Sequence, residues 1–131
     1  MPVLDASVAV EMVLRTFAGR RAFAQIATVP GAVHAPHLID VEVMYALRRL
    51  VQKRELAPQD ASVAIDALPM LEIERHAHLV LLPRIWELRD GITAYDATYV
   101  ALAEALEQPL FTRDAKLSRS HGHHAEIILL Q

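Results

Sequence analysis

Short apolar runs alternate along the chain with longer segments in which apolar residues recur every three or four positions. Short runs are typical of buried strands, and the longer pattern is typical of amphipathic helices. The strands that this pattern predicts are residues 1–4, 32–35, 70–73, 110–112 and 127–130. Because strands that alternate with helices form parallel sheets, we expect an α/β fold with a mostly parallel sheet and helices on both faces.

Helix-starting and helix-breaking residues set the expected helix limits. Ser7 is an N-cap candidate for the first helix, Gly19 precedes the second, and Pro83 should kink or divide the fifth. The other expected helices are residues 20–27, 38–54, 59–68, 76–89 and 93–106, with a brief helical turn after Asp114. In the 93–106 segment Thr93 is a good N-cap, and the apolar side chains form one stripe that suits a buried helix.

Composition limits the classes of protein to which the chain can belong. With 131 residues and a hydrophobic fraction of 53%, residues 1–131 are expected to form a single domain with one core. The absence of cysteine excludes disulfides, thiolate metal sites and cysteine nucleophiles, and permits a reducing cytoplasm. No signal peptide is recognisable, and no apolar stretch approaches the ~18 residues of a membrane span. We therefore expect a cytoplasmic protein that does not enter a membrane.

The charge balance is weakly acidic, with a net charge of −3 and a pI of about 6.1. It argues against a protein whose whole surface binds nucleic acid, but leaves room for a local basic patch. Candidates for contacts with phosphates are Arg48, Arg49, Lys53 and Arg54, near the end of the third expected helix. A cationic carboxyl end is also ordinary for a helix, so both interpretations stay open.

Four acidic residues are placed where the expected topology would bring them together. Asp5 directly follows the first strand, and Asp114 closely follows the fourth. Glu42 lies early in the helix that leaves the second strand, and Asp96 lies in the first turn of the 93–106 helix. Ligands of parallel sheets gather at the carboxyl ends of the strands, so we expect these four side chains to meet there.

Each acid also has a purely structural interpretation. Asp5 and Asp114 could cap helices, and Glu42 could be a solvated helix residue. Asp96 stands three residues after Thr93, which is the spacing of a capping box that closes a helix end. The functional interpretation therefore depends on all four residues meeting at one place.

Four neighbouring carboxylates would have a defined chemistry. Like charges a few ångströms apart raise one another's pKa, and a bound cation relieves the repulsion. An all-oxygen ligand set favours Mg²⁺ or Mn²⁺ over zinc and suits phosphoryl chemistry, in which the cation activates water. Ser7 and Thr112, beside two of the acids, could hold water or a phosphate oxygen, or could simply cap helices.

Four sequence segments together resemble a known family. They are LDAS around Asp5, PHLIDVEVMYALRRL around Glu42, AYDATYVALAE around Asp96 and PLFTRDAKL around Asp114. In this order they are similar to PIN-domain ribonucleases, specifically the VapC toxins of bacterial type II toxin–antitoxin pairs. The resemblance covers the whole chain and implies a three-layer α/β/α PIN-like fold with five strands in the order 3-2-1-4-5.

The same resemblance implies an activity and partners. Asp5, Glu42, Asp96 and Asp114 would be the catalytic, metal-binding acids of a Mg²⁺-dependent endoribonuclease, in which Mn²⁺ substitutes for Mg²⁺. The protein would be a homodimer, neutralised by a small cognate antitoxin that lays a helix and tail over it. Asp40 lies two residues before Glu42, and the two side chains point about 200° apart on a helix. Only one of them is expected to be a ligand, and Glu42 is preferred.

The histidines do not form a recognisable metal motif. His121, His123 and His124 lie around Gly122, and their spacing with His76 and His78 matches no familiar zinc pattern. His34 and His37, at the second strand, could approach the carboxyl edge of the sheet, but nothing in the sequence requires it.

Other classes of protein fit part of the pattern. A receiver domain needs an acidic pair after the first strand, where Asp5 stands alone, and a haloacid-dehalogenase-like phosphatase needs an acid where Ser7 stands. A non-catalytic interaction domain that kept the fold is a further alternative. The presence of all four acids argues against it.

Overall fold

Five parallel strands form the sheet in a computed structural model that describes all residues from Met1 to Gln131. The strands are β1 (Val3–Leu4), β2 (Val33–Pro36), β3 (Ile73–His76), β4 (Leu110–Thr112) and β5 (Ile127–Leu129). Their order is β3-β2-β1-β4-β5, and every neighbouring pair is parallel. The predicted α/β class and the order 3-2-1-4-5 are confirmed.

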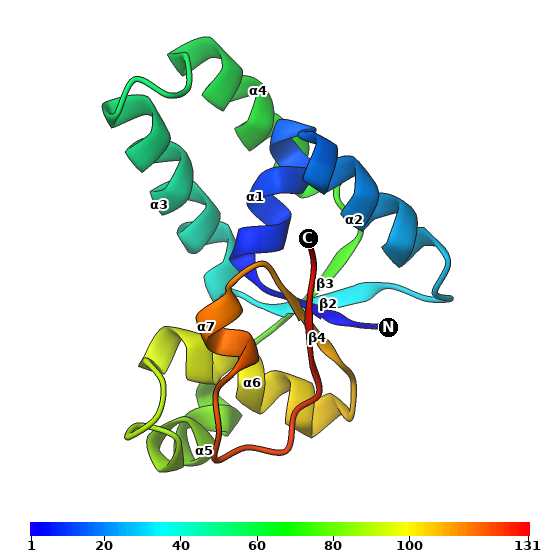
Figure 1. Ribbon diagram of the computed structural model, residues 1–131, viewed down its shortest axis with the longest axis vertical. Coiled ribbons are helices and arrows are strands. Elements are labelled where there is room, and N and C mark those ends of the chain that lie inside the picture. The colour runs from blue at the N-terminus through cyan, green and yellow to red at the C-terminus, as the bar shows by residue number, and fades with distance from the viewer.

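Helices cover both faces of the sheet, as Figure 1 shows. One face carries α1 (Ala6–Leu14), α2 (Phe17–Ala27), α3 (Leu38–Gln52) and α4 (Pro58–Ala67), and the other carries α5 (Leu82–Glu87) and α6 (Ala94–Leu106). The short helix α7 (Ala115–Ser118) follows β4 directly, and 3₁₀ turns occupy Leu68–Met70 and Leu79–Leu81. Because the central strands are covered on both sides, every residue of β1, β2 and β4 is buried.

Helix α6 is the most deeply buried helix and carries one of the candidate acids. All residues at positions 97–103 are buried, and three of them are alanines that let the helix pack closely against the sheet. The Thr93 side chain caps the helix as predicted, by accepting a hydrogen bond from the Asp96 N–H at 3.1 Å. The position of Asp96 is therefore fixed by the core.

None of the helices is both long and apolar enough to span a membrane.

Three predicted elements near proline or glycine were wrong. The strand expected at residues 70–73 lies at Ile73–His76, because Pro69 and Met70 belong to a 3₁₀ turn and β3 takes its register from β2. Gly19 lies inside α2, where a Cβ atom would collide with the Glu11 carbonyl of α1. The helix expected at residues 76–89 begins only at Leu82, and Pro83 occupies its first turn instead of kinking it.

The prediction of Ser7 as the first N-cap was also wrong. Helix α1 begins at Ala6, with Asp5 in the N-cap position, and Ser7 lies in the first turn. Asp5 makes no capping hydrogen bond with its side chain. The carboxylate is thus left for other contacts at the end of β1.

Candidate metal centre

The four predicted acids lie at the carboxyl edge of the sheet, each on a different segment. Asp5 directly follows β1, Asp114 follows β4, Glu42 is in the second turn of α3 and Asp96 is in the first turn of α6. Their charges interact: Asp5 raises the pKa of both Glu42 and Asp96, Asp96 also raises that of Glu42, and Asp114 raises that of Asp96. The structure therefore brings all four acids into one electrostatic cluster.

Asp5 is held in place by the two hydroxyl groups that flank it. Ser7 Oγ and Thr112 Oγ1 each donate a hydrogen bond to Asp5 Oδ2 at 2.7 Å, while Oδ1 accepts none. Thr112 Oγ1 in turn accepts from the Asp114 N–H, and Ser7 Oγ accepts from the Arg113 N–H, both at 3.0 Å. Neither hydroxyl caps a helix. Ser7 and Thr112 instead fix the Asp5 carboxylate and link the ends of β1 and β4.

Asp114 has the structural role that the sequence left open, but this role uses only part of its carboxylate. Oδ1 caps α7 by accepting from the N–H groups of Lys116 at 2.9 Å and Leu117 at 3.4 Å. Oδ2 forms no hydrogen bond within the chain. Capping therefore orients Asp114 and leaves one of its oxygens available.

Asp96 does not complete a capping box. The Thr93 side chain accepts from the Asp96 N–H, but the Thr93 N–H donates no bond back to the Asp96 carboxylate. Burial raises the pKa of the Asp96 carboxyl, and the charges of Asp5 and Asp114 raise it further, against smaller lowering effects of Thr93 and Lys116. The Asp96 carboxylate is thus influenced both by two other acids and by the Thr93 side chain at the start of its own helix.

Glu42 carries an unpaired, buried oxygen. Glu42 Oε1 and the Tyr99 hydroxyl are both buried without a hydrogen-bond partner. Burial raises the pKa of Glu42; the nearby Tyr99 hydroxyl lowers it, and the charges of Asp5 and Asp96 raise it. Burying an unpaired carboxylate oxygen is costly, and a cation beside it would remove that cost.

Sequence reasoning did not assign Tyr99 to the site, because it placed this residue in the apolar stripe of its helix. The available signal was spacing, since Tyr99 follows Asp96 by three positions and therefore lies on the same helix face.

Asp40 lies outside the cluster. Both of its oxygens accept hydrogen bonds from the Arg75 guanidinium, at 2.7 and 2.8 Å. This bidentate pair occupies the Asp40 carboxylate on α3 and leaves Glu42 as the acid that faces the others.

The donor set fits a hard divalent cation. All of the donors are carboxylate oxygens, which suit Mg²⁺ and Mn²⁺. No three of the four acids have oxygens within 4.8 Å of one another. Mg²⁺ keeps several of its water ligands, so it suits carboxylates spaced in this way. The residues present therefore fit a hydrated Mg²⁺ ion better than a dehydrated one.

The sequence of the chain matches a known family over most of its length. The PIN domain family model matches residues 3–121. The chain belongs to the PIN-domain family. This PIN domain is 46% identical over 99 residues to Ribonuclease VapC1 of Mycobacterium tuberculosis, covering 75% of this chain and 74% of VapC1.

Two further similarities extend over nearly the whole PIN domain. It is 40% identical over 130 residues to Ribonuclease VapC12 of Mycobacterium tuberculosis, covering 99% of each chain. Its fold is similar to that of a chain in the toxin–antitoxin complex from Klebsiella pneumoniae, with a TM-score of 0.64 and 16% identity over 91% of each chain. The resemblance to VapC proteins predicted from the four sequence segments is confirmed.

Two clefts that are partly lined by basic side chains lie beside the acids of this PIN domain. A cleft of about 690 Å³ contains Asp96 and Asp114 and is also lined by Arg89, Lys116 and Arg119. A second cleft, of about 470 Å³, lies beside Ser7 and is lined by Arg49, Lys53 and Arg113, the last of which forms an ion pair with Glu11 at 2.9 Å. An anionic polymer could therefore be held by cations on both sides of the acid cluster.

In the metal-free PIN domain, Glu42→Gln and Asp96→Asn are each expected to raise the melting temperature at pH 7 by roughly 2–4 °C. Folding raises the pKa of both carboxyl groups, so their ionisation costs more in the folded than in the unfolded protein. This cost grows as the pH rises above the unfolded value of about 4. Thermal unfolding in EDTA between pH 4 and 8 should therefore show a gain that vanishes at the acid end.

Asp66→Asn, at an exposed position of α4, is the control and should leave the melting temperature unchanged. Added Mg²⁺ should stabilise the wild type more than either site variant. A lower melting temperature for both site variants in EDTA would mean that these carboxylates stabilise the fold as ordinary helix residues.

Proposed function

We propose that this PIN domain is a Mg²⁺-dependent endoribonuclease of the VapC toxin type, which hydrolyses phosphodiester bonds of RNA. The observation that carries the proposal is the meeting of four carboxylates at the carboxyl edge of the sheet, with Glu42 Oε1 buried and unpaired. The names of the relatives VapC1 and VapC12 support a ribonuclease activity. We further propose that residues 1–131 form a single PIN domain.

The four acids are the proposed metal ligands, and neighbouring groups orient two of them. Asp5, Glu42, Asp96 and Asp114 would hold Mg²⁺, or Mn²⁺ in its place, which would supply activation of water and neutralisation of charge on the scissile phosphate. Ser7 and Thr112 are positioning residues that keep Asp5 Oδ2 occupied and Oδ1 free. The α7 cap aligns Asp114 in a similar way.

The cleft lined by Arg49 and Lys53 continues the face of α3 on which Glu42 lies. Arg49 and Lys53 follow Glu42 by seven and eleven positions, which returns each to within about 20° of Glu42 around the helix. Arg48 follows by six positions and points about 120° away. Of the basic residues selected from the sequence, only Arg49 and Lys53 line this cleft. These two side chains would therefore contact phosphates of an RNA strand that passes over the four acids.

The double variant Arg49→Ala/Lys53→Ala is expected to bind RNA about 10-fold more weakly than the wild type at low salt, because two phosphate contacts are lost. The slope of log affinity against log salt should also decrease by roughly 1.4, which is the value for two single-strand contacts. Binding is measured with Asp96→Asn present in all proteins, so that RNA stays intact. Arg48→Ala/Arg54→Ala is the charge-matched control, and equal losses in the two double variants would mean only a general charge effect.

The partners follow from the same proposal. A small cognate antitoxin neutralises the enzyme, and the toxin–antitoxin complex from Klebsiella pneumoniae contains a chain of similar fold. Exposed apolar side chains around α5, which include Leu79, Val80 and Trp86, offer a surface for a homodimer. A cytoplasmic location is compatible with the absence of cysteine.

RNA cleavage by the purified protein tests the proposal. A panel of structured RNAs is incubated with Mg²⁺, with Mn²⁺ and with EDTA. Cleavage with either metal ion and none with EDTA is the expected result. RNA that stays intact although Mn²⁺ binds to the protein would favour the non-catalytic interaction domain over an enzyme.

A further inference from the structure

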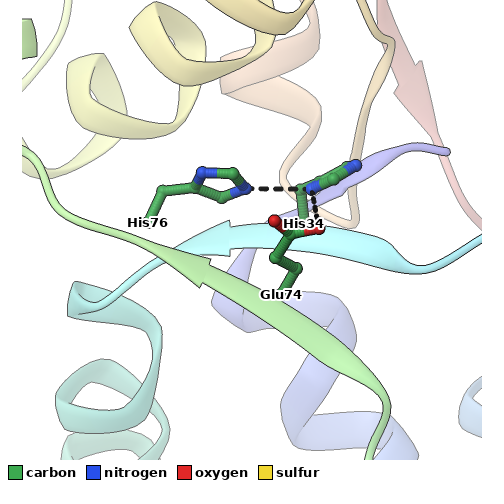
Figure 2. A group of neighbouring side chains, drawn as sticks. All are labelled: His34, Glu74 and His76. Atoms are coloured by element: carbon green, nitrogen blue, oxygen red, sulfur yellow. Dashed lines mark hydrogen bonds and ion pairs between the residues drawn. The ribbon is translucent and has the colours of Figure 1, made fainter.

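A second group of potential ligands lies on the other half of the sheet, away from the acids. His34 comes from β2, and Glu74 and His76 come from β3, and Figure 2 shows their polar ends turned toward one another. His34 Nδ1 lies 2.9 Å from His76 Nε2 and 3.6 Å from Glu74 Oε2. The three residues can each place one ligand atom within 4.8 Å of the other two.

The two imidazoles form a hydrogen bond with each other, and the Glu74 carboxylate lies just beyond hydrogen-bond distance of His34. A neutral imidazole carries one N–H, so His34 Nδ1 can donate to His76 or to Glu74 but not well to both. Burial lowers the pKa of His34, and the charge of His76 lowers it further, against a smaller raising effect of the Glu74 carboxylate. When the His34 ring instead carries its hydrogen atom on Nε2, all three facing atoms can offer lone pairs, and a neutral imidazole is the form that binds metal ions.

The spacing of these atoms is close to that of a tetrahedral zinc site. Two ligands at about 2.0–2.1 Å from a tetrahedral zinc ion lie roughly 3.3–3.4 Å apart. The observed separations of 2.9 and 3.6 Å from His34 Nδ1 lie on either side of this value. Small rotations of the side chains would therefore be enough to bind the ion.

The backbone holds the group in place before any ion binds. His34 is directly paired with Glu74 in the parallel ladder, and His76 is paired with Pro36. Because side chains alternate along a strand, Glu74 and His76 lie on one face of the sheet, and Arg75, which contacts Asp40 of α3, lies on the other. His34 is 7% exposed, and the His76 carbonyl accepts a hydrogen bond from the His37 N–H at 2.9 Å.

We propose that His34, Glu74 and His76 form a Zn²⁺ site with a fourth position open to water. Two imidazoles and one carboxylate are a known zinc ligand set, whereas Mg²⁺ prefers oxygen ligands only. The ion joins the edge strand β3 to its neighbour β2 and so stabilises an edge that has no other strand beside it. Its ligands come from β2 and β3, whereas the four acids of the candidate Mg²⁺ site follow β1 and β4 or lie on α3 and α6.

Zinc binding by the full chain without a histidine tag tests this proposal. Metal-free protein is titrated with Zn²⁺ in competition with a chromophoric chelator, in an Asp96→Asn background that weakens the acid site. We expect one Zn²⁺ per chain, and binding that is at least about 100-fold weaker in Glu74→Gln and in His76→Gln. Co²⁺ in place of Zn²⁺ should give the visible absorption of a tetrahedral site, which both variants should lose.

His78→Gln and His123→Gln are the matched controls and should bind Zn²⁺ as the parent does. Zn²⁺ should also raise the melting temperature of the parent but not that of Glu74→Gln, whose side chain is 59% exposed and can be replaced without loss of packing. Unchanged zinc affinity in Glu74→Gln, or no saturable Zn²⁺ binding by the parent, would overturn the proposal. These readouts do not depend on RNA cleavage.

Discussion

Asp96→Asn is expected to lower the rate of RNA cleavage at least about 1,000-fold while the fold stays intact. Asp96 is coupled to both Asp5 and Asp114, so its loss removes an anion from the middle of the cluster. Asparagine has nearly the same shape, and the cap of α6 is made by the backbone N–H of residue 96, which the substitution keeps. Initial rates in Mg²⁺, on an RNA that the wild type cleaves, measure the effect.

Asp66→Asn is the matched control for this loss, because it removes one carboxylate from an exposed position of α4. The two variants must be purified in the same way, so that a contaminating nuclease would appear in both. A rate for Asp96→Asn within about tenfold of the wild type, a difference of only 1.4 kcal/mol in barrier, would remove this residue from the catalytic group.

Thr112→Val is expected to weaken both the fold and the metal site. The hydroxyl of this fully buried side chain donates to Asp5 Oδ2 at 2.7 Å and accepts from the Asp114 N–H at 3.0 Å. Its loss leaves a buried carboxylate oxygen with one donor fewer and should cost about 1–3 kcal/mol of unfolding free energy. Because Asp5 and Asp114 both lose their orientation, Mn²⁺ affinity should fall about 10–100-fold. Urea unfolding and Mn²⁺ titration measure the two effects.

Thr98→Val separates these two effects. Thr98 is also buried, and its hydroxyl donates to the Ala94 carbonyl at 2.7 Å, but it touches none of the acids. This variant should lose stability and keep its Mn²⁺ affinity. If Thr112→Val likewise kept its Mn²⁺ affinity, Thr112 would be a structural residue only.

The sheet order and the positions of the acids were predictable because they depend on local signals. A few neighbouring residues are enough to encode such a signal. Examples are the acid Asp5 directly after β1 and the N-cap Thr93 at the start of α6. Parallel topology then places strand ends and helix starts at one edge. The structural and functional interpretations were also less exclusive than they seemed from sequence, since Asp114 caps α7 with one oxygen and keeps the other free.

Other features depended on contacts between distant segments and were not predictable. The register of β3 is set by its pairing with β2, and this pairing brings His76 to His34, which is 42 positions away in the sequence. The sequence did not show what Asp40 contacts. Its carboxylate accepts two hydrogen bonds from Arg75 of β3, which is 35 positions away in the sequence. Tyr99 could not be told from the other buried residues of α6 in the sequence. Its closeness to Glu42 depends on how α6 packs against α3.

Anomalous diffraction from crystals grown with Mn²⁺ would test the central claim most directly. We expect a peak at the carboxyl edge of the sheet, between the carboxylates of Asp5, Glu42, Asp96 and Asp114, in the wild type and a much weaker one in Asp96→Asn. Manganese bound elsewhere, with none near these four side chains at a concentration that supports RNA cleavage, would contradict the assignment of the active site.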